Sequence, residues 1–134
     1  MSAMFPSAKA LLLTAGIDLE NDSGIKVILI DSADYTYNSA HDFLNDVPVA
    51  ARVGTATALA SRTIDQPSPG VFDAADTSLL TVTGDPSEAI LLFKDTGVEA
   101  TSSLIAYIDG FQVTPNGGTI VLQYDSGPNR IMAL

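Results

Sequence analysis

The chain has 134 residues, 16 acidic against 6 basic side chains, a formal charge of −10 and no cysteine. The length predicts one domain over residues 1–134, and the scattered Lys and Arg residues argue against binding nucleic acid or an anionic membrane surface. The absence of cysteine excludes disulfides and thiolate metal sites. A hydrophobic fraction of 46% beside 16% charged residues, with a mean hydropathy of +0.26, favours a protein that assembles with other chains.

The N-terminal segment predicts a short helix. Ser7 is a candidate cap, alanines and leucines follow it, and Gly16 is a candidate C-terminal stop. An extended conformation of residues 10–14 is an alternative at this length. The apolar run ALLL is shorter than the core of a signal peptide, so we interpret the segment as part of the fold.

Two strands and several irregular segments are expected next. Residues 17–20 alternate apolar with acidic side chains, as a short edge strand does, and residues 21–24 predict a turn before a strand at 25–31. Further along, residues 34–37 predict a brief strand or extended segment. One helical turn is expected at 39–44, before Pro48.

The middle of the chain predicts an extended stretch at 49–64, most strand-like at 56–65. Residues 66–70 (QPSPG) predict a surface loop, because two prolines and a glycine fix the backbone and supply few donors. Residues 78–83 predict another strand, closed by a turn at 84–86.

Residues 88–109 predict a central antiparallel hairpin. Its two runs, 89–93 and 104–108, are apolar on both parities, whereas a strand wet on one face alternates. Both faces are therefore expected to be covered, by a second sheet, a helix or another subunit.

The C-terminal part predicts a continuation of the sheet at 111–114, a tight turn at 115–118, a long strand at 119–125, a turn at 126–129 and a packed apolar end at 131–134. Many short strands with regular turn signals and little helix predict a mainly β fold. The expected architecture is an antiparallel β-sandwich or barrel, jelly-roll-like, with one or two short helices.

Candidate catalytic chemistry is sparse. His41 is the only histidine, and Asp42 beside it is a candidate orienting group, but no nucleophile motif accompanies them. A histidine that packs in a loop is the competing interpretation. We predict that the protein is not an enzyme and has no catalytic residues and no cofactor.

Four aspartates were considered as calcium ligands: Asp65, Asp73, Asp76 and Asp85. They lack the dense ligand spacing of a calcium-binding loop, so no metal site is predicted. Asp73 is instead expected to cap a turn or short helix, with its carboxylate accepting from the amides of Ala75 and Asp76. The acidic surplus is interpreted as a solvated face.

Aromatic side chains are the candidate residues for a glycan-binding module, and the expectation for them is core packing instead. They are Tyr35, Tyr37, Phe43, Tyr107 and Tyr124.

The order of several segments resembles a group of small virion proteins of tailed bacteriophages. The likeness rests on AKALLLTAGIDL and IKVILID (8–19, 25–31), DYTYNSAHDFL (34–44), AARV (50–53) and VFDAAD (71–76). It rests above all on FKDTGVEATSSLIAYID and VTPNGG (93–109, 113–118). The connection at 109–111 is shorter than the loop that the relatives have at this place.

The resemblance implies a structural protein without catalysis. The implied function is a capsid decoration (cement) protein on the virion surface, made in the bacterial host cytoplasm. Its implied partners are the major capsid protein and itself, as a homotrimer. A tail or baseplate component, or a receptor- or glycan-binding module, is the alternative.

Overall fold

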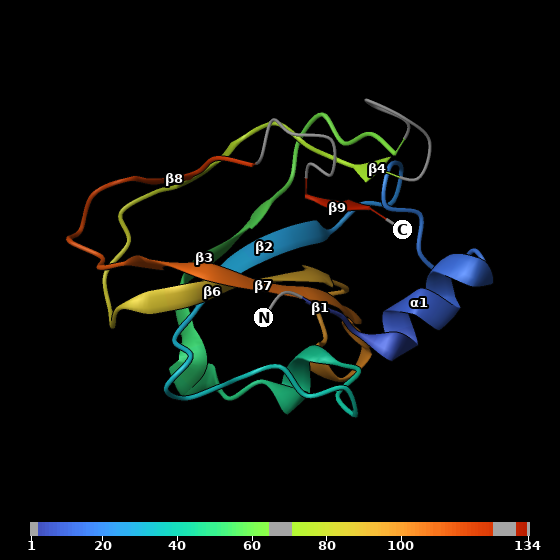
Figure 1. Cartoon of the computed structure of the whole chain (residues 1–134), viewed down its shortest axis with the longest axis horizontal. Helices are drawn as coiled ribbons and strands as arrows, with labels where there is room; N and C mark the ends of the chain where they lie inside the picture. The colour runs from blue at the N-terminus through green and yellow to red at the C-terminus, as the bar shows by residue number, and fades with distance from the viewer. Residues whose placement is uncertain (1–2, 65–70, 125–130, 134) are drawn as a thin grey trace.

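The computed structural model describes residues 3–64, 71–124 and 131–133, and it is mainly β (Figure 1). Its strands are β1 (Ala3–Met4), β2 (Ile25–Ile30), β3 (Arg52–Ala58), β4 (Val71–Phe72), β5 (Thr77–Leu79), β6 (Ser87–Lys94), β7 (Leu104–Val113), β8 (Ile120–Leu122) and β9 (Met132–Ala133). Helix α1 spans Pro6–Leu13, and short 3₁₀ turns cover Leu44–Asp46, Val49–Ala51 and Glu99–Thr101.

The strands form one large antiparallel sheet and two small ones. The large sheet has the order β1-β7-β6-β2-β3, and the small sheets pair β4 with β9 and β5 with β8. The large sheet is open, with β1 and β3 at its edges. The predicted mainly β, sandwich-like class is therefore confirmed.

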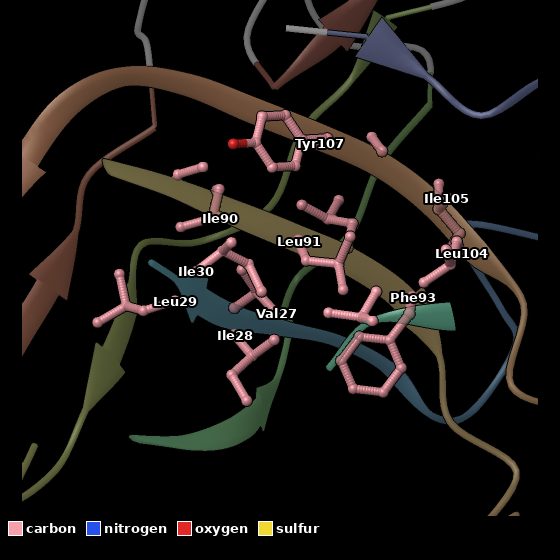
Figure 2. Packing of buried hydrophobic residues seen from close by; sticks show 14 of the residues in the cluster. Val27, Ile28, Leu29, Ile30, Ile90, Leu91, Phe93, Leu104, Ile105 and Tyr107 are labelled. Atoms are coloured by element: carbon pink, nitrogen blue, oxygen red, sulfur yellow. The ribbon is translucent and has the colours of Figure 1, made fainter. Parts of the chain in front are cut away.

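The central hairpin lies where the sequence predicts it. β6 and β7 pair antiparallel, with Leu91 opposite Tyr107 and Ile90 opposite Ile108, and β2 pairs with the other edge of β6. Residues 89–93 and 104–107 are all buried. Figure 2 shows side chains of this cluster projecting from both faces of the three strands.

Different segments cover the two faces of the sheet. The face that carries Tyr107 packs against the irregular segment after β2, where the ring of Tyr35 lies 6.1 Å from that of Tyr107. The face that carries Ile90 and Ile108 adjoins Ile120 of β8. In Figure 1 the irregular segment runs below the sheet and β8 above it. The cover is thus a small second sheet on one side and non-repetitive chain on the other.

Arg52 fastens the irregular segment to the rest of the fold. Its guanidinium donates to the carbonyl oxygens of Leu44 (2.9 Å) and Val47 (2.7 Å) and forms a two-bond ion pair with Glu99 (2.9 Å each). Two 3₁₀ turns distant in sequence are joined through this one side chain.

Helix α1 forms, but its predicted ends are wrong. Phe5 is the N-cap and provides no side-chain cap, while Ser7 lies inside the first turn with its Oγ buried and without a hydrogen-bond partner among the described residues. At the other end Ala15, not Gly16, takes a positive φ of 60°. The extended alternative for residues 10–14 is also wrong.

The strand predicted at 17–20 is absent. Instead Asp18 accepts the amides of Glu20 (3.0 Å) and Asn21 (3.1 Å), so its side chain closes a turn. Ile17 and Leu19 are nevertheless buried, which explains the alternation that suggested a strand.

The helical turn predicted at 39–44 begins at Leu44. The carboxylate of Asp46 accepts the amides of Asp42 (3.0 Å) and Phe43 (3.2 Å), which places the turn later in the chain. The brief strand predicted at 34–37 is absent, because Asp34 lies in a turn and residues 35–37 belong to no strand.

Strand boundaries shift elsewhere. The extended stretch forms β3 at Arg52–Ala58 rather than at 56–65, because its partner β2 pairs with that part of it. The strands predicted at 78–83 and 119–125 shorten to β5 and β8, and the positive φ of 52° at Thr81 ends extended geometry there. β7 continues the sheet to Val113 as predicted.

The expected packing of the C-terminal end is seen at Ile131, which is partly buried against the core and donates its amide to the carbonyl oxygen of Phe72 (3.0 Å). β9 pairs antiparallel with β4. The predicted loop at 66–70 and turn at 126–129 lie outside the described residues.

Candidate functional site

His41 is engaged in packing rather than with Asp42. Its Nδ1 lies 3.0 Å from the hydroxyl oxygen of Tyr35, and the two rings stack with their centroids 5.6 Å apart. Burial raises the pKa of Tyr35 to about 12, so this hydroxyl stays neutral at physiological pH. The arrangement holds a loop against the aromatic face of the sheet.

Three of the four candidate calcium ligands lie within the described residues, and these three do not gather into one site. Asp73 pairs with Thr63 in an isolated backbone bridge, and the amide of Ala75 donates to the carbonyl oxygen of Ala60. The amide of Ala75 is thus engaged elsewhere, so the predicted bond from Ala75 to the Asp73 carboxylate is wrong. Asp76 accepts the amide of Tyr124 (3.1 Å), and Asp65 lies outside the described residues.

Asp85 approaches two other aspartates that the sequence did not single out. One carboxylate oxygen from each of Asp31, Asp34 and Asp85 lies within 4.8 Å of the others. The pairing of β2 with β6 brings the end of one strand beside the start of the other, so this group could be found only after that pairing was known. Three carboxylates supply fewer than the six to eight oxygens that Ca²⁺ takes, and nothing further points to a bound ion.

Four of the five aromatic candidates pack in the core or against it, as expected: Tyr35 and Tyr107 belong to the buried cluster, and Tyr37 and Tyr124 pack against that cluster. Tyr35 and Tyr107 are buried, whereas Tyr37, Phe43 and Tyr124 are partly buried. The hydroxyl groups of Tyr124 and Thr77 form a hydrogen bond, with 2.6 Å between their oxygens. Burial raises the pKa of Tyr124.

A surface pocket of about 660 Å³, the aromatic pocket, lies where three distant segments meet. Its aromatic side chains are Tyr37, Tyr107 and Phe111. Its polar side chains are Ser32, Thr36, Glu88 and Asp109. Sequence analysis considered Tyr37 and Tyr107 but missed Glu88 and Phe111, because only strand pairing brings them to the same place.

Glu88 is held in a defined position in the aromatic pocket. Its Oε1 accepts the amide (3.1 Å) and the hydroxyl (2.7 Å) of Ser32. The pKa of Tyr107 is raised by burial and, to a lesser extent, by the negative charge of Glu88. A carboxylate thus lies near a phenol whose burial disfavours its ionised form.

A second concave surface, the apolar groove, has a volume of about 390 Å³. It runs between the large sheet and β8 and is lined mainly by Ile90, Ile108, Val113, Ile120 and Leu122. Its side chains suit packing against apolar surface and carry no chemistry for a reaction.

These features define a mainly β, sandwich-like protein with two candidate binding surfaces. Neither the family models nor the curated proteins compared with the chain match it. Within the described residues no helix is long and apolar enough to cross a membrane.

Proposed function

We propose that the protein is a structural component of a tailed-bacteriophage virion. In this proposal it is a decoration (cement) protein that binds the outer surface of the major capsid protein, stabilises the shell and performs no catalysis. The order of segments that resembles small phage virion proteins supplies the identity of the particle.

The observation that carries the proposal is the exposure of large apolar side chains on a chain whose core is already covered on both faces. Leu13 is 89% exposed, Val49 71% and Leu80 70%. They lie on α1, in the irregular segment and just after β5, so they are spread over the surface. Single apolar side chains are common on protein surfaces, so each contributes only where a partner covers it; burial there would stabilise an assembly by roughly 25 cal/mol per Å² of apolar surface.

Self-association as a homotrimer is the expected form, because decoration proteins would sit at local three-fold positions of an icosahedral shell. The formal charge of −10 would help keep the outer particle surface from adsorbing nucleic acid.

The test is the copy number and position of the protein in purified particles, measured by quantitative mass spectrometry and cryo-electron microscopy. Hundreds of copies over the head, in groups of three, are expected. A few copies at the tail would identify a tail or baseplate component, and absence from the particle would overturn the proposal.

A matched pair of variants tests the role of the exposed apolar side chains. Leu80→Asp should weaken binding to shells stripped of the protein, whereas Ser78→Asp, an exposed neighbour on β5, should bind more like the wild type. A co-sedimentation assay measures the bound fraction. If the two variants bind the shells equally well, Leu80 is not part of the interface with the capsid.

A further inference from the structure

The aromatic pocket has the polar chemistry of a site for a cation. The side chains that line it, within the described residues, offer carboxylate and hydroxyl groups and include no Lys, Arg, His, Asn or Gln. Two of its hydroxyl donors are already engaged, that of Ser32 with Glu88 and that of Tyr37 with the carbonyl oxygen of Met4, so the wall offers more acceptors than free donors. A ligand that brings several donors and a positive charge would complement it.

Glu88 is prepared to receive that ligand. Both hydrogen bonds from Ser32 end on Oε1, which fixes the carboxylate and leaves Oε2 without a hydrogen bond in the described part of the chain. The described ion pairs, Lys26–Asp95, Arg52–Glu99 and Lys94–Asp22, do not include Glu88. Its charge therefore has no basic partner among the described residues.

Aromatic rings stand beside this carboxylate. Phe111 is 36% exposed, Tyr37 is partly buried, and the rings of Tyr37 and Tyr107 lie 6.5 Å apart between centroids. A flat cation gains by stacking on such rings, and a guanidinium does so more readily than a compact, strongly hydrated ammonium.

From this combination we propose that the aromatic pocket receives an arginine side chain of a partner protein. The guanidinium donates to Glu88 and lies against the exposed ring of Phe111 and the partly buried ring of Tyr37. The volume of about 660 Å³ leaves room for the backbone that carries the arginine. A neutral sugar fits less well, because its hydroxyls need donors from the wall as well as acceptors.

The test is an NMR titration of the full chain with N-acetyl-arginine amide, with N-acetyl-citrulline amide as the uncharged probe of nearly the same shape. The arginine probe should bind in the millimolar range and shift resonances of Glu88 and Phe111, and the citrulline probe should bind at least about tenfold more weakly. Binding should weaken further with added salt.

Variants locate the interaction. Glu88→Gln keeps the acceptor for Ser32 but removes the charge, and should weaken the arginine probe about tenfold or more. Glu20→Gln, in the turn between α1 and β2, makes the same change of net charge and should leave affinity unchanged. Phe111→Ala should weaken binding about two- to fivefold through loss of stacking.

The proposal would be overturned if the wild type binds the two probes equally or does not bind the arginine probe. It would also be overturned if Glu88→Gln binds the arginine probe with undiminished affinity. The same holds if methyl glucoside shifts the same resonances while the arginine probe does not. If Glu88→Gln fails to fold, the comparison of the two probes on the wild type and the affinity of Phe111→Ala still test whether the aromatic pocket binds the guanidinium. The titration uses the isolated chain, so its outcome is independent of the copy number in particles, which tests the proposed role as a decoration protein.

Discussion

At the residue scale, Gly24 is the position where a side chain is least tolerable. Its φ is +81°, and a Cβ placed there would lie 2.4 Å from the backbone oxygen of Asp95. Gly97 has a similar φ of +85°, but a Cβ there meets nothing within 4 Å. The two glycines thus separate backbone strain from steric overlap.

We therefore expect Gly97→Ala to lower the free energy of unfolding by about 1 kcal/mol, from backbone strain alone. Gly24→Ala should lower it by about 3 kcal/mol, because the turn before β2 must also move away from Asp95. Urea denaturation measures both. Similar losses for the two variants would mean that the turn relaxes without cost.

Arg52 supports a second prediction at this scale. Arg52→Lys should cost about 2 kcal/mol, because one ammonium cannot reproduce the bonds to two carbonyl oxygens and the two-bond pair with Glu99.

The control for this prediction is Arg62→Lys. Arg62 donates to the carbonyl oxygen of Leu19 (2.8 Å), a contact that a lysine can replace, so a loss below about 1 kcal/mol is expected. Thermal unfolding compares the stability of the two variants. An equal loss of stability would show that the four hydrogen bonds of Arg52 contribute no more than the single bond of Arg62.

At the scale of elements, the β6–β7 hairpin carries the core. Leu91 of β6 is fully buried opposite Tyr107, whereas Leu80, just after β5, is 70% exposed. Leu91→Ala should lower the free energy of unfolding by about 3 kcal/mol through loss of burial and the cavity left behind.

Leu80→Ala is the matched control and should change stability by less than about 0.5 kcal/mol. Chemical denaturation of the isolated chain measures both effects. A large loss for Leu80→Ala would mean that this side chain is buried in solution, which self-association would explain; repeating the measurement at several protein concentrations would separate that case.

At the scale of the whole molecule, the acidic surplus couples stability to pH. Backbone amides and basic partners lower the folded-state pKa values of Asp22, Asp46 and Asp95 below 3.8. The ionised carboxylates then stabilise the folded state fully above about pH 4, and this contribution is lost as pH falls through their lower folded-state pKa values.

The melting temperature should therefore fall as the pH is lowered from about 5 to about 2. In Asp46→Asn the fall should be shallower, because the hydrogen bonds from Asp42 and Phe43 no longer depend on ionisation of residue 46. Differential scanning calorimetry checks this, and parallel curves for variant and wild type would rule out a contribution from Asp46.

Sequence patterns alone predicted the mainly β class, β2 and the β6–β7 hairpin. The reason is physical: a strand covered on both faces must be apolar on both parities, and that signature is local. The consecutive residues Asn116 and Gly117 likewise predicted the turn before β8, where Gly117 has a φ of +86°.

Tertiary structure decided the rest. The start of β3 at Arg52 follows from pairing with β2. Ala15 takes the positive φ after α1 although its residue type disfavours it, while the next amide, that of Gly16, donates to the carbonyl oxygen of Leu11 (2.7 Å). The aromatic pocket joins Ser32, Glu88 and Phe111, which lie far apart in sequence and meet only through the pairing of β2, β6 and β7. Local sequence patterns predict burial and turns, whereas a binding surface made of distant residues forms only when the strands pair.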